Sequence, residues 1–137
     1  MQHVQTRSTT SALVLTAVLI ALATLFTMYT KIPVPGIRGY FNVGDVVIMT
    51  SALLLGRKYG AYIGAIGPAL ADLFLGYAVF VPITFVVKGI EGYLVGTVYN
   101  NKTTTSALVA TIVGGIIIVA GYFIAEYFVF DPGVAIA

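Results

Sequence analysis

The chain has 137 residues, of which 59% are hydrophobic and 9% are charged, and its mean hydropathy is +1.01. Soluble domains contain about 45–50% apolar and about 25% charged residues, and a water-soluble domain of this size has too little interior to hide the excess. The absence of cysteine excludes a disulfide-stapled secreted domain, and a net charge of +2 excludes a basic nucleic-acid-binding surface. The composition predicts an all-α membrane protein, a polytopic bundle of transmembrane helices.

Five apolar stretches qualify as membrane spans, since crossing the hydrocarbon core takes roughly 20 helical residues. The first ends before Pro33 and Pro35, which cannot continue a helix. The second follows Asn42 and Asp45, both good N-cap residues, and its apolar part is short, so we expect residues 41–45 to lie inside the protein at membrane depth. The fourth starts at Pro82, a favourable first-turn residue. The predicted spans of this single domain cover residues 11–29, 42–56, 59–78, 82–99 and 106–128.

Positive residues orient the bundle, because cytoplasmic loops are enriched in Lys and Arg. A cytoplasmic amino terminus places two positive residues, Lys31 and Arg38, outside. The positive residues that it places inside are Arg7, Arg57, Lys58 and Lys102. We therefore predict a multi-pass plasma-membrane protein with its amino terminus in the cytoplasm. The first span is not expected to be a cleaved signal peptide, because the Ala21-Leu22-Ala23 site lies within the apolar run. An odd number of spans leaves the carboxyl terminus outside. The last residues, Gly133-Val134-Ala135-Ile136-Ala137, resemble the approach to another helix, so we expect a sixth helix beyond residue 137.

Ionisable residues inside the predicted spans are candidates for function, because a bilayer penalises buried charge. In the predicted topology Asp45, Asp72, Lys88 and Glu91 all fall in the outer half of the bundle. That clustering favours a polar cavity open to the outside over a polar path across the whole membrane. The competing interpretation is structural: Lys88 and Glu91, three residues apart, neutralise each other, and Asp72 pairs with Lys88 across helices.

Aromatic residues gather at the same end. Many are expected to form an interfacial belt, and the remainder to stack against a flat heterocycle. They are Tyr40, Phe41, Tyr77, Phe80, Phe85, Tyr122, Phe123, Tyr127, Phe128 and Phe130. The segment 31–44, rich in proline and glycine, is long enough to act as a lid over a cavity or to serve as an ordinary connecting loop.

Small residues at four-residue spacing let helices approach closely. Gly60 with Gly64, and Gly92 with Gly96, predict packing inside the bundle, whereas the stripe formed by Ala17 and Ala21 of the first span offers a contact to another membrane protein.

Catalytic groups are scarce in this sequence. The only histidine is His3, in the polar leader, so the predicted spans offer no zinc or haem ligand, no thiol nucleophile and no histidine base. No phosphate-binding glycine-rich loop is present. We therefore expect neither an enzyme nor a resident cofactor.

Several motifs, in order along residues 12–130, resemble the substrate-binding S components of energy-coupling factor (ECF) vitamin transporters, in particular their riboflavin- and hydroxymethylpyrimidine-type branch. These motifs are Gly39-Tyr40-Phe41-Asn42-Val43-Gly44-Asp45, Leu53-Leu54-Leu55-Gly56, Ala69-Leu70-Ala71-Asp72-Leu73 with Gly76-Tyr77, and Lys88-Gly89-Ile90-Glu91-Gly92. The resemblance implies a six-helix fold with a cytoplasmic amino terminus and an outward-facing pocket closed by segment 31–44. It also implies that Ala17 and Ala21 contact a transmembrane coupling subunit driven by two cytoplasmic ATPases.

The resulting hypothesis is a non-enzymatic subunit that captures a vitamin or vitamin precursor for an ATP-driven importer. Asn42, Asp45 and Lys88 are the first candidates for polar contacts to the ligand or the gate, with Asp72 and Glu91 positioning them. Tyr40 and Phe41 are candidates for lid or stacking contacts. Two alternatives remain open at this point: a stand-alone carrier coupled to protons through a carboxylate, and a membrane scaffold in which the charges only hold helices together.

Overall fold

The computed structural model describes residues 9–33, 40–99 and 103–129. In these ranges the chain forms five helices, as expected for an all-α membrane protein, and one short hairpin that was not expected. Their bounds are α1 (Thr9–Tyr29), β1 (Lys31–Pro33), β2 (Tyr40–Asn42), α2 (Val43–Leu55), α3 (Arg57–Phe74), α4 (Phe80–Val98) and α5 (Thr104–Val129). The predicted sixth helix and the tip of segment 31–44 lie outside the described residues.

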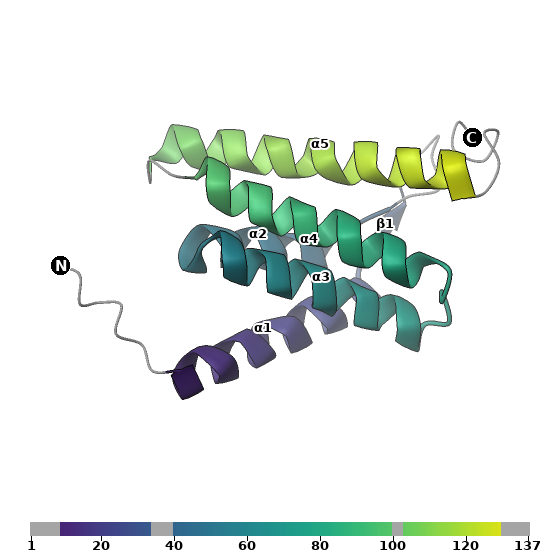
Figure 1. Cartoon of the computed structure of the whole chain (residues 1–137), viewed down its shortest axis with the longest axis horizontal. Helices are drawn as coiled ribbons and strands as arrows, with labels where there is room; N and C mark the ends of the chain where they lie inside the picture. The colour runs from purple at the N-terminus through teal and green to yellow at the C-terminus, as the bar shows by residue number, and fades with distance from the viewer. Residues whose placement is uncertain (1–8, 34–39, 100–102, 130–137) are drawn as a thin grey trace.

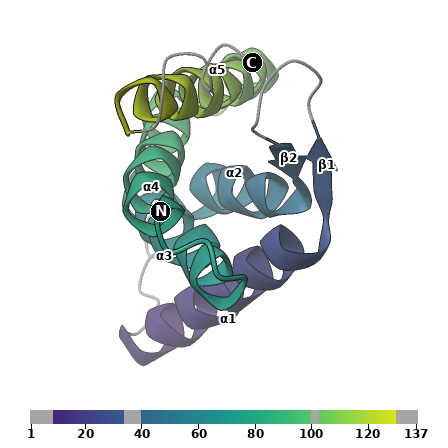
Figure 2. The ribbon, with the colours of Figure 1, turned by 90° about the vertical axis from the view of Figure 1, so that its right-hand side faces the viewer.

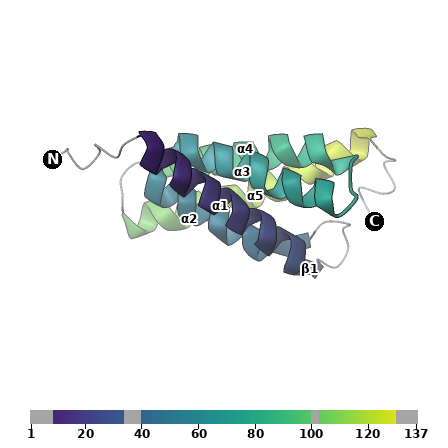
Figure 3. The same cartoon turned by 90° about the horizontal axis from the view of Figure 1, so that it is seen from below.

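The helices run back and forth along one long axis, so the described ends of alternate helices meet at the same end of the bundle (Figure 1). The end that carries β1 and β2 is called the hairpin end below. Seen from there, α5, α4, α3 and α1 form an arc around α2, and the hairpin lies on the remaining side (Figure 2). Helix α1 crosses the others obliquely (Figure 3).

The central position of α2 follows from its packing. Ile48 of α2 packs with Ala23 of α1 and Ile63 of α3, and all three are fully buried. One turn further along, Ala52 packs with Val95 of α4 and Ala110 of α5. A helix only 13 residues long, about 20 Å, therefore joins two clusters of core side chains.

Three described helices are long and apolar enough to cross a membrane, namely residues Thr10–Tyr29, Phe80–Val98 and Thr104–Ala125. Helix α2 is apolar but shorter, in agreement with the short second stretch of the sequence. Helix α3 has 18 residues but includes Arg57, Lys58 and Asp72. Helix α2 lies inside the arc, and α3 lies in the arc between α1 and α4 (Figure 2). Each of these two helices contacts at least three other helices.

The contact between α3 and α4 is the most extensive in the molecule, and it depends on glycine. A Cβ atom at Gly92 would lie 2.0 Å from the carbonyl oxygen of Gly60, and one at Gly64 would lie 2.3 Å from the carbonyl oxygen of Lys88. One at Gly96 would lie 2.5 Å from Arg57 Cα. The predicted role of these glycines in internal packing is confirmed.

Element boundaries differ from the sequence-based ranges at the hairpin end. Helix α3 ends at Phe74, before Gly76 with a φ of +87°, and α4 begins at Phe80, so that Pro82 is its third residue rather than its first. Proline is tolerated there because the first amides of a helix have no intrahelical partner. The segment expected to be a loop contains paired strands, with Ile32 opposite Phe41.

Candidate functional site

Helices α2 and α4 bring Asp45, Lys88 and Glu91 together in the interior. The Lys88 ammonium donates a hydrogen bond to Asp45 Oδ1 and forms an ion pair with it. Its Nζ atom lies 3.5 Å from Glu91 Oε2, the carboxylate one turn further along α4. Lys88 is 3% exposed and Glu91 is completely buried. We call these three residues the acid–lysine cluster.

The local sequence explains how these side chains reach one another. Asp45 lies in the first turn of α2, where the helix dipole favours a negative charge. Gly64 lets the backbone of α3 approach Lys88 closely, and this contact fixes the height of Lys88 along the bundle. Lys88 lies about 12 Å along α4 from its first residue, Phe80.

Three oxygen atoms of the cluster are buried without a hydrogen-bond partner: Asp45 Oδ2, Glu91 Oε1 and Glu91 Oε2. Buried polar atoms in folded proteins almost always have such a partner. The ion pair expected between Lys88 and Glu91 is present. Oxygen atoms of Asp45 and Glu91 can still accept further hydrogen bonds.

A second polar group joins α3, α4 and α5 next to the cluster. Thr84 donates a hydrogen bond of 2.5 Å to Asp72 Oδ2, and its oxygen lies 2.8 Å from the Tyr122 hydroxyl. Because Thr84 gives its only proton to the carboxylate, the tyrosine donates to Thr84. The Lys88 ammonium lies 5.9 Å from the centre of the Tyr122 ring, within the range of a cation–π contact. Tyr122 therefore links Asp72 to the acid–lysine cluster.

Asn42 occupies the junction of the hairpin, α1 and α2. It is the N-cap of α2, but its side chain makes no capping bond. It accepts a 3.3 Å hydrogen bond from Thr27 of α1 instead. A Cβ atom at Gly44 would lie 2.2 Å from Thr27 Oγ1, so the glycine makes room for this contact. Asn42 and Asp45 are thus both buried at the hairpin end of α2.

The remaining candidates lie apart from the cluster. Tyr40 and Phe41 belong to β2 and pair with Pro33 and Ile32, while their side chains lie outside the described part of the structure. Ala17 and Ala21 are on the exposed side of α1, away from the buried residues Ala23 and Thr27.

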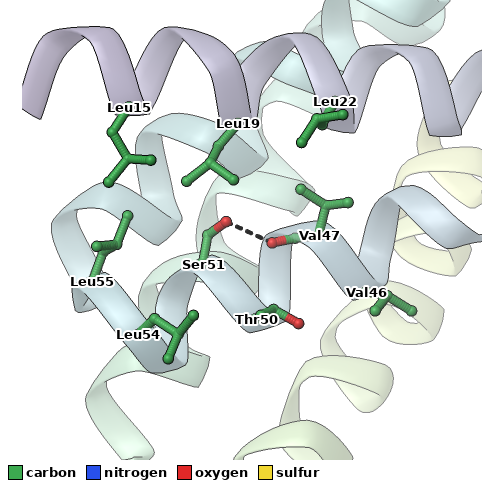
Figure 4. A pocket seen from close by; sticks show the side chains of 9 residues that line it. All are labelled: Leu15, Leu19, Leu22, Val46, Val47, Thr50, Ser51, Leu54 and Leu55. Atoms are coloured by element: carbon green, nitrogen blue, oxygen red, sulfur yellow. Dashed lines mark hydrogen bonds between the residues drawn. The ribbon is translucent and has the colours of Figure 1, made fainter.

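A groove of about 300 Å³ separates α1 from α2, and none of the candidate residues lines it. Its walls are almost entirely apolar, and the hydroxyl of Ser51 is already bonded to the carbonyl oxygen of Val47 at 2.7 Å. Figure 4 shows leucines of α1 pointing toward α2 across this space. The lining residues are Leu15, Leu19, Leu22, Val46, Val47, Thr50, Ser51, Leu54 and Leu55. The groove lacks the converging polar groups of a small-molecule site.

Sequence reasoning missed Thr84 and Thr27, and it considered Tyr122 only as one of the aromatic residues that form the interfacial belt or stack against a heterocycle. A signal for Thr84 is present, because positions 84, 88 and 91 share one face of a helix. Tyr122 and Thr27 join the site through other helices, and no spacing within the sequence reveals those contacts.

Comparison with known proteins adds an independent finding. The family described as "ECF-type riboflavin transporter, S component" matches residues 7–137. A protein of Pyrococcus woesei, described as "Uncharacterized protein in gap 3'region", is 42% identical over 117 residues, which cover 83% of this chain and 77% of that protein. The thiamine precursor transporter HmpT of Lactococcus lactis subsp. cremoris (strain MG1363) is 32% identical over 124 residues, which cover 89% of this chain and 68% of HmpT.

Proposed function

The chain belongs to the family of ECF-type riboflavin transporter S components, and on that basis we propose that it captures a vitamin or vitamin precursor for import. The proposed ligand is a small heterocycle of the riboflavin or hydroxymethylpyrimidine type. The name of the family refers to riboflavin, and the name of HmpT refers to a thiamine precursor. The chain itself is a transporter subunit and not an enzyme.

The observation that carries the proposal is the acid–lysine cluster. Its buried carboxylate oxygens without a hydrogen-bond partner supply acceptors, and Lys88 supplies a donor. Directional polar groups within an otherwise apolar bundle are what a small-molecule site requires. Asn42 and Asp45 place two of these groups at the hairpin end, which is the outer end if the amino terminus is cytoplasmic. The hairpin then acts as the lid of an outward-facing pocket, with Tyr40 and Phe41 contributing lid or stacking contacts.

Import also needs a source of energy. The proposal assigns it to a transmembrane coupling subunit and two cytoplasmic ATPases, as expected for an ECF module. Ala17 and Ala21 support this assignment, because both small side chains lie on the exposed side of α1 and leave a flat strip for a neighbouring helix.

Binding by the purified chain in detergent tests the proposal. Equilibrium dialysis with radiolabelled riboflavin and with hydroxymethylpyrimidine is expected to give saturable binding of one of them. The substitutions Lys88→Ala and Asn42→Ala are each expected to weaken that binding by about tenfold or more, since the lost contact is worth roughly 1.5 kcal/mol or more. Thr111→Val is the matched control, because Thr111 is exposed on α5 and bonds only its own helix.

Unchanged affinity in both variants would remove these residues from the site. No binding of any vitamin-like heterocycle would favour the scaffold hypothesis. Uptake by cells that express this chain without an ECF module, abolished by Asp72→Asn or Glu91→Gln, would favour the proton-coupled carrier.

A further inference from the structure

The balance of donors and acceptors in the acid–lysine cluster is uneven. Two carboxyl groups, Asp45 and Glu91, share the single ammonium of Lys88. A third carboxyl group, Asp72, is connected to them through Thr84 and Tyr122. Acceptors therefore outnumber donors in the buried part of the site that the structure describes.

No ion pair joins a second cation of the described helices to the cluster. Apart from Lys88, their only lysine and arginine residues are Arg57 and Lys58. These residues begin α3, and both are exposed. Arg57 lies over the Tyr93 ring, with 5.5 Å between its Cζ atom and the ring centroid.

The described residues include no group of three or more His, Cys, Asp or Glu side chains suited to hold a metal ion. Asp45 Oδ2 and Glu91 Oε1 have no hydrogen-bond donor among the described residues, and Glu91 Oε2 has only the 3.5 Å ion-pair contact with Lys88. N–H or O–H groups of a ligand are the donors that such acceptors lack.

We propose that the site selects ligands that present several hydrogen-bond donors and carry no negative charge, and that it discriminates against phosphorylated or otherwise anionic forms of the same heterocycle. This inference rests on the proposed function and adds a selection rule to it. A neutral or cationic ligand supplies donors to Asp45 Oδ2 and to Glu91, whereas an anion brings further acceptors to a site that already has too many. Glu91 and Asp45 are the residues that set the preference.

Two matched pairs of probes test the inference on the whole chain in detergent: riboflavin with riboflavin 5′-phosphate, and hydroxymethylpyrimidine with its phosphate ester. Dissociation constants are measured for both members of the pair that binds. We expect the phosphorylated member to bind on the order of tenfold more weakly. This factor corresponds to the repulsion between the phosphate group and one carboxylate about 10 Å away at an effective dielectric constant of about 20.

Variants separate charge from size. Glu91→Gln removes the charge and keeps the shape, so the ratio of the two dissociation constants is expected to fall toward one. Asp45→Asn tests the same point if Glu91→Gln does not fold, as judged by circular dichroism. Lys58→Gln is the control, because it changes the net charge by one unit at an exposed residue that forms no ion pair with the cluster, and it is expected to leave the ratio unchanged.

Equal binding of both members by the unmodified chain overturns the selection rule and leaves the proposed function standing. A ratio that stays high in the carboxamide variants also overturns it, since the discrimination is then steric. Failure of every probe to bind overturns the proposed function, and the selection rule with it.

Discussion

Lys88 is the residue on which the interior of this protein depends most. An ammonium group taken out of water loses several kcal/mol of solvation, and it is retained only with good partners. Lys88 has two carboxylates within ion-pair distance and the face of an aromatic ring nearby. Two of its partners come from helices far away in sequence, so these contacts tie α2 and α5 to α4. The same groups then serve two purposes, holding helices in register and offering charge to a ligand.

Thr84 is the central residue of the Asp72–Thr84–Tyr122 contact. Its hydroxyl is the shared partner of Asp72 and Tyr122 in a buried position. Thr84→Val keeps the shape and removes the hydroxyl, leaving two buried groups without that bond. We expect a loss of about 1–3 kcal/mol in the free energy of unfolding, measured by thermal or denaturant unfolding in detergent.

Thr111→Val is the matched control for Thr84→Val, because the exposed Thr111 hydroxyl bonds only the carbonyl oxygen of Ala107 in its own helix. We expect a change of less than about 0.5 kcal/mol there. Similar losses in the two variants would show that the Asp72–Thr84–Tyr122 contact carries no special weight.

At the scale of elements, backbone contact between α3 and α4 organises the bundle. Association of helices in a membrane depends on close packing, because lipid tails are as apolar as leucine. Gly60 and Gly92 meet with their backbones in contact, and Gly64 meets Lys88 one turn closer to the hairpin end. The position of the acid–lysine cluster therefore depends on two glycines of α3 that carry no chemistry themselves.

The substitution Gly92→Ala tests this contact. The added methyl group would lie 2.0 Å from the Gly60 carbonyl oxygen, which belongs to rigid helix backbone, so α3 and α4 must separate. We expect a destabilisation of about 1–3 kcal/mol or more, seen as a lower unfolding midpoint in detergent, because overpacking forces backbone shifts.

Gly115→Ala provides the comparison in α5, where a Cβ atom meets nothing within 4 Å. Alanine has the higher helix propensity, so the midpoint is expected to stay the same or to rise. A Gly92→Ala protein as stable as Gly115→Ala would contradict the role of glycine in the α3–α4 contact.

At the scale of the whole molecule, the orientation of the bundle in the membrane decides whether the site faces the outside or the cytoplasm. The hairpin, the start of α2 and the end of α3 share one end of the bundle (Figure 1), so one experiment on sidedness places them all. The distribution of lysine and arginine predicts that this end faces outward, with Arg57 and Lys58 in the cytoplasm.

The chain contains no cysteine, so single introduced thiols report sidedness without background. Lys58→Cys is expected to resist a membrane-impermeant maleimide added to intact cells and to react after permeabilisation. Lys31→Cys is expected to react from outside in intact cells. The reverse pattern would place the site on the cytoplasmic side and would contradict capture of an external vitamin.

Much of the fold follows from hydropathy. Long apolar runs interrupted by proline, glycine and charge locate the five helices, because a bilayer admits only segments whose backbone groups bond internally. The hairpin was not predicted, since strands of three residues leave no periodic pattern and Pro33 argues against a strand. The end of α3 and the start of α4 differ by a few residues from the predicted spans. Hydropathy does not locate the turn between these two helices.

The sequence by itself determined that this is a helical membrane protein, that its ionisable residues gather toward one end, and which four of them to consider. Only the tertiary structure decided that Lys88 bonds Asp45 across 43 residues of sequence, that Asp72 reaches Tyr122 through Thr84, and which carboxyl oxygens are left without a partner. The reason is physical: hydropathy and helical spacing are properties of neighbouring residues, whereas pairing between helices depends on how closely their backbones pack.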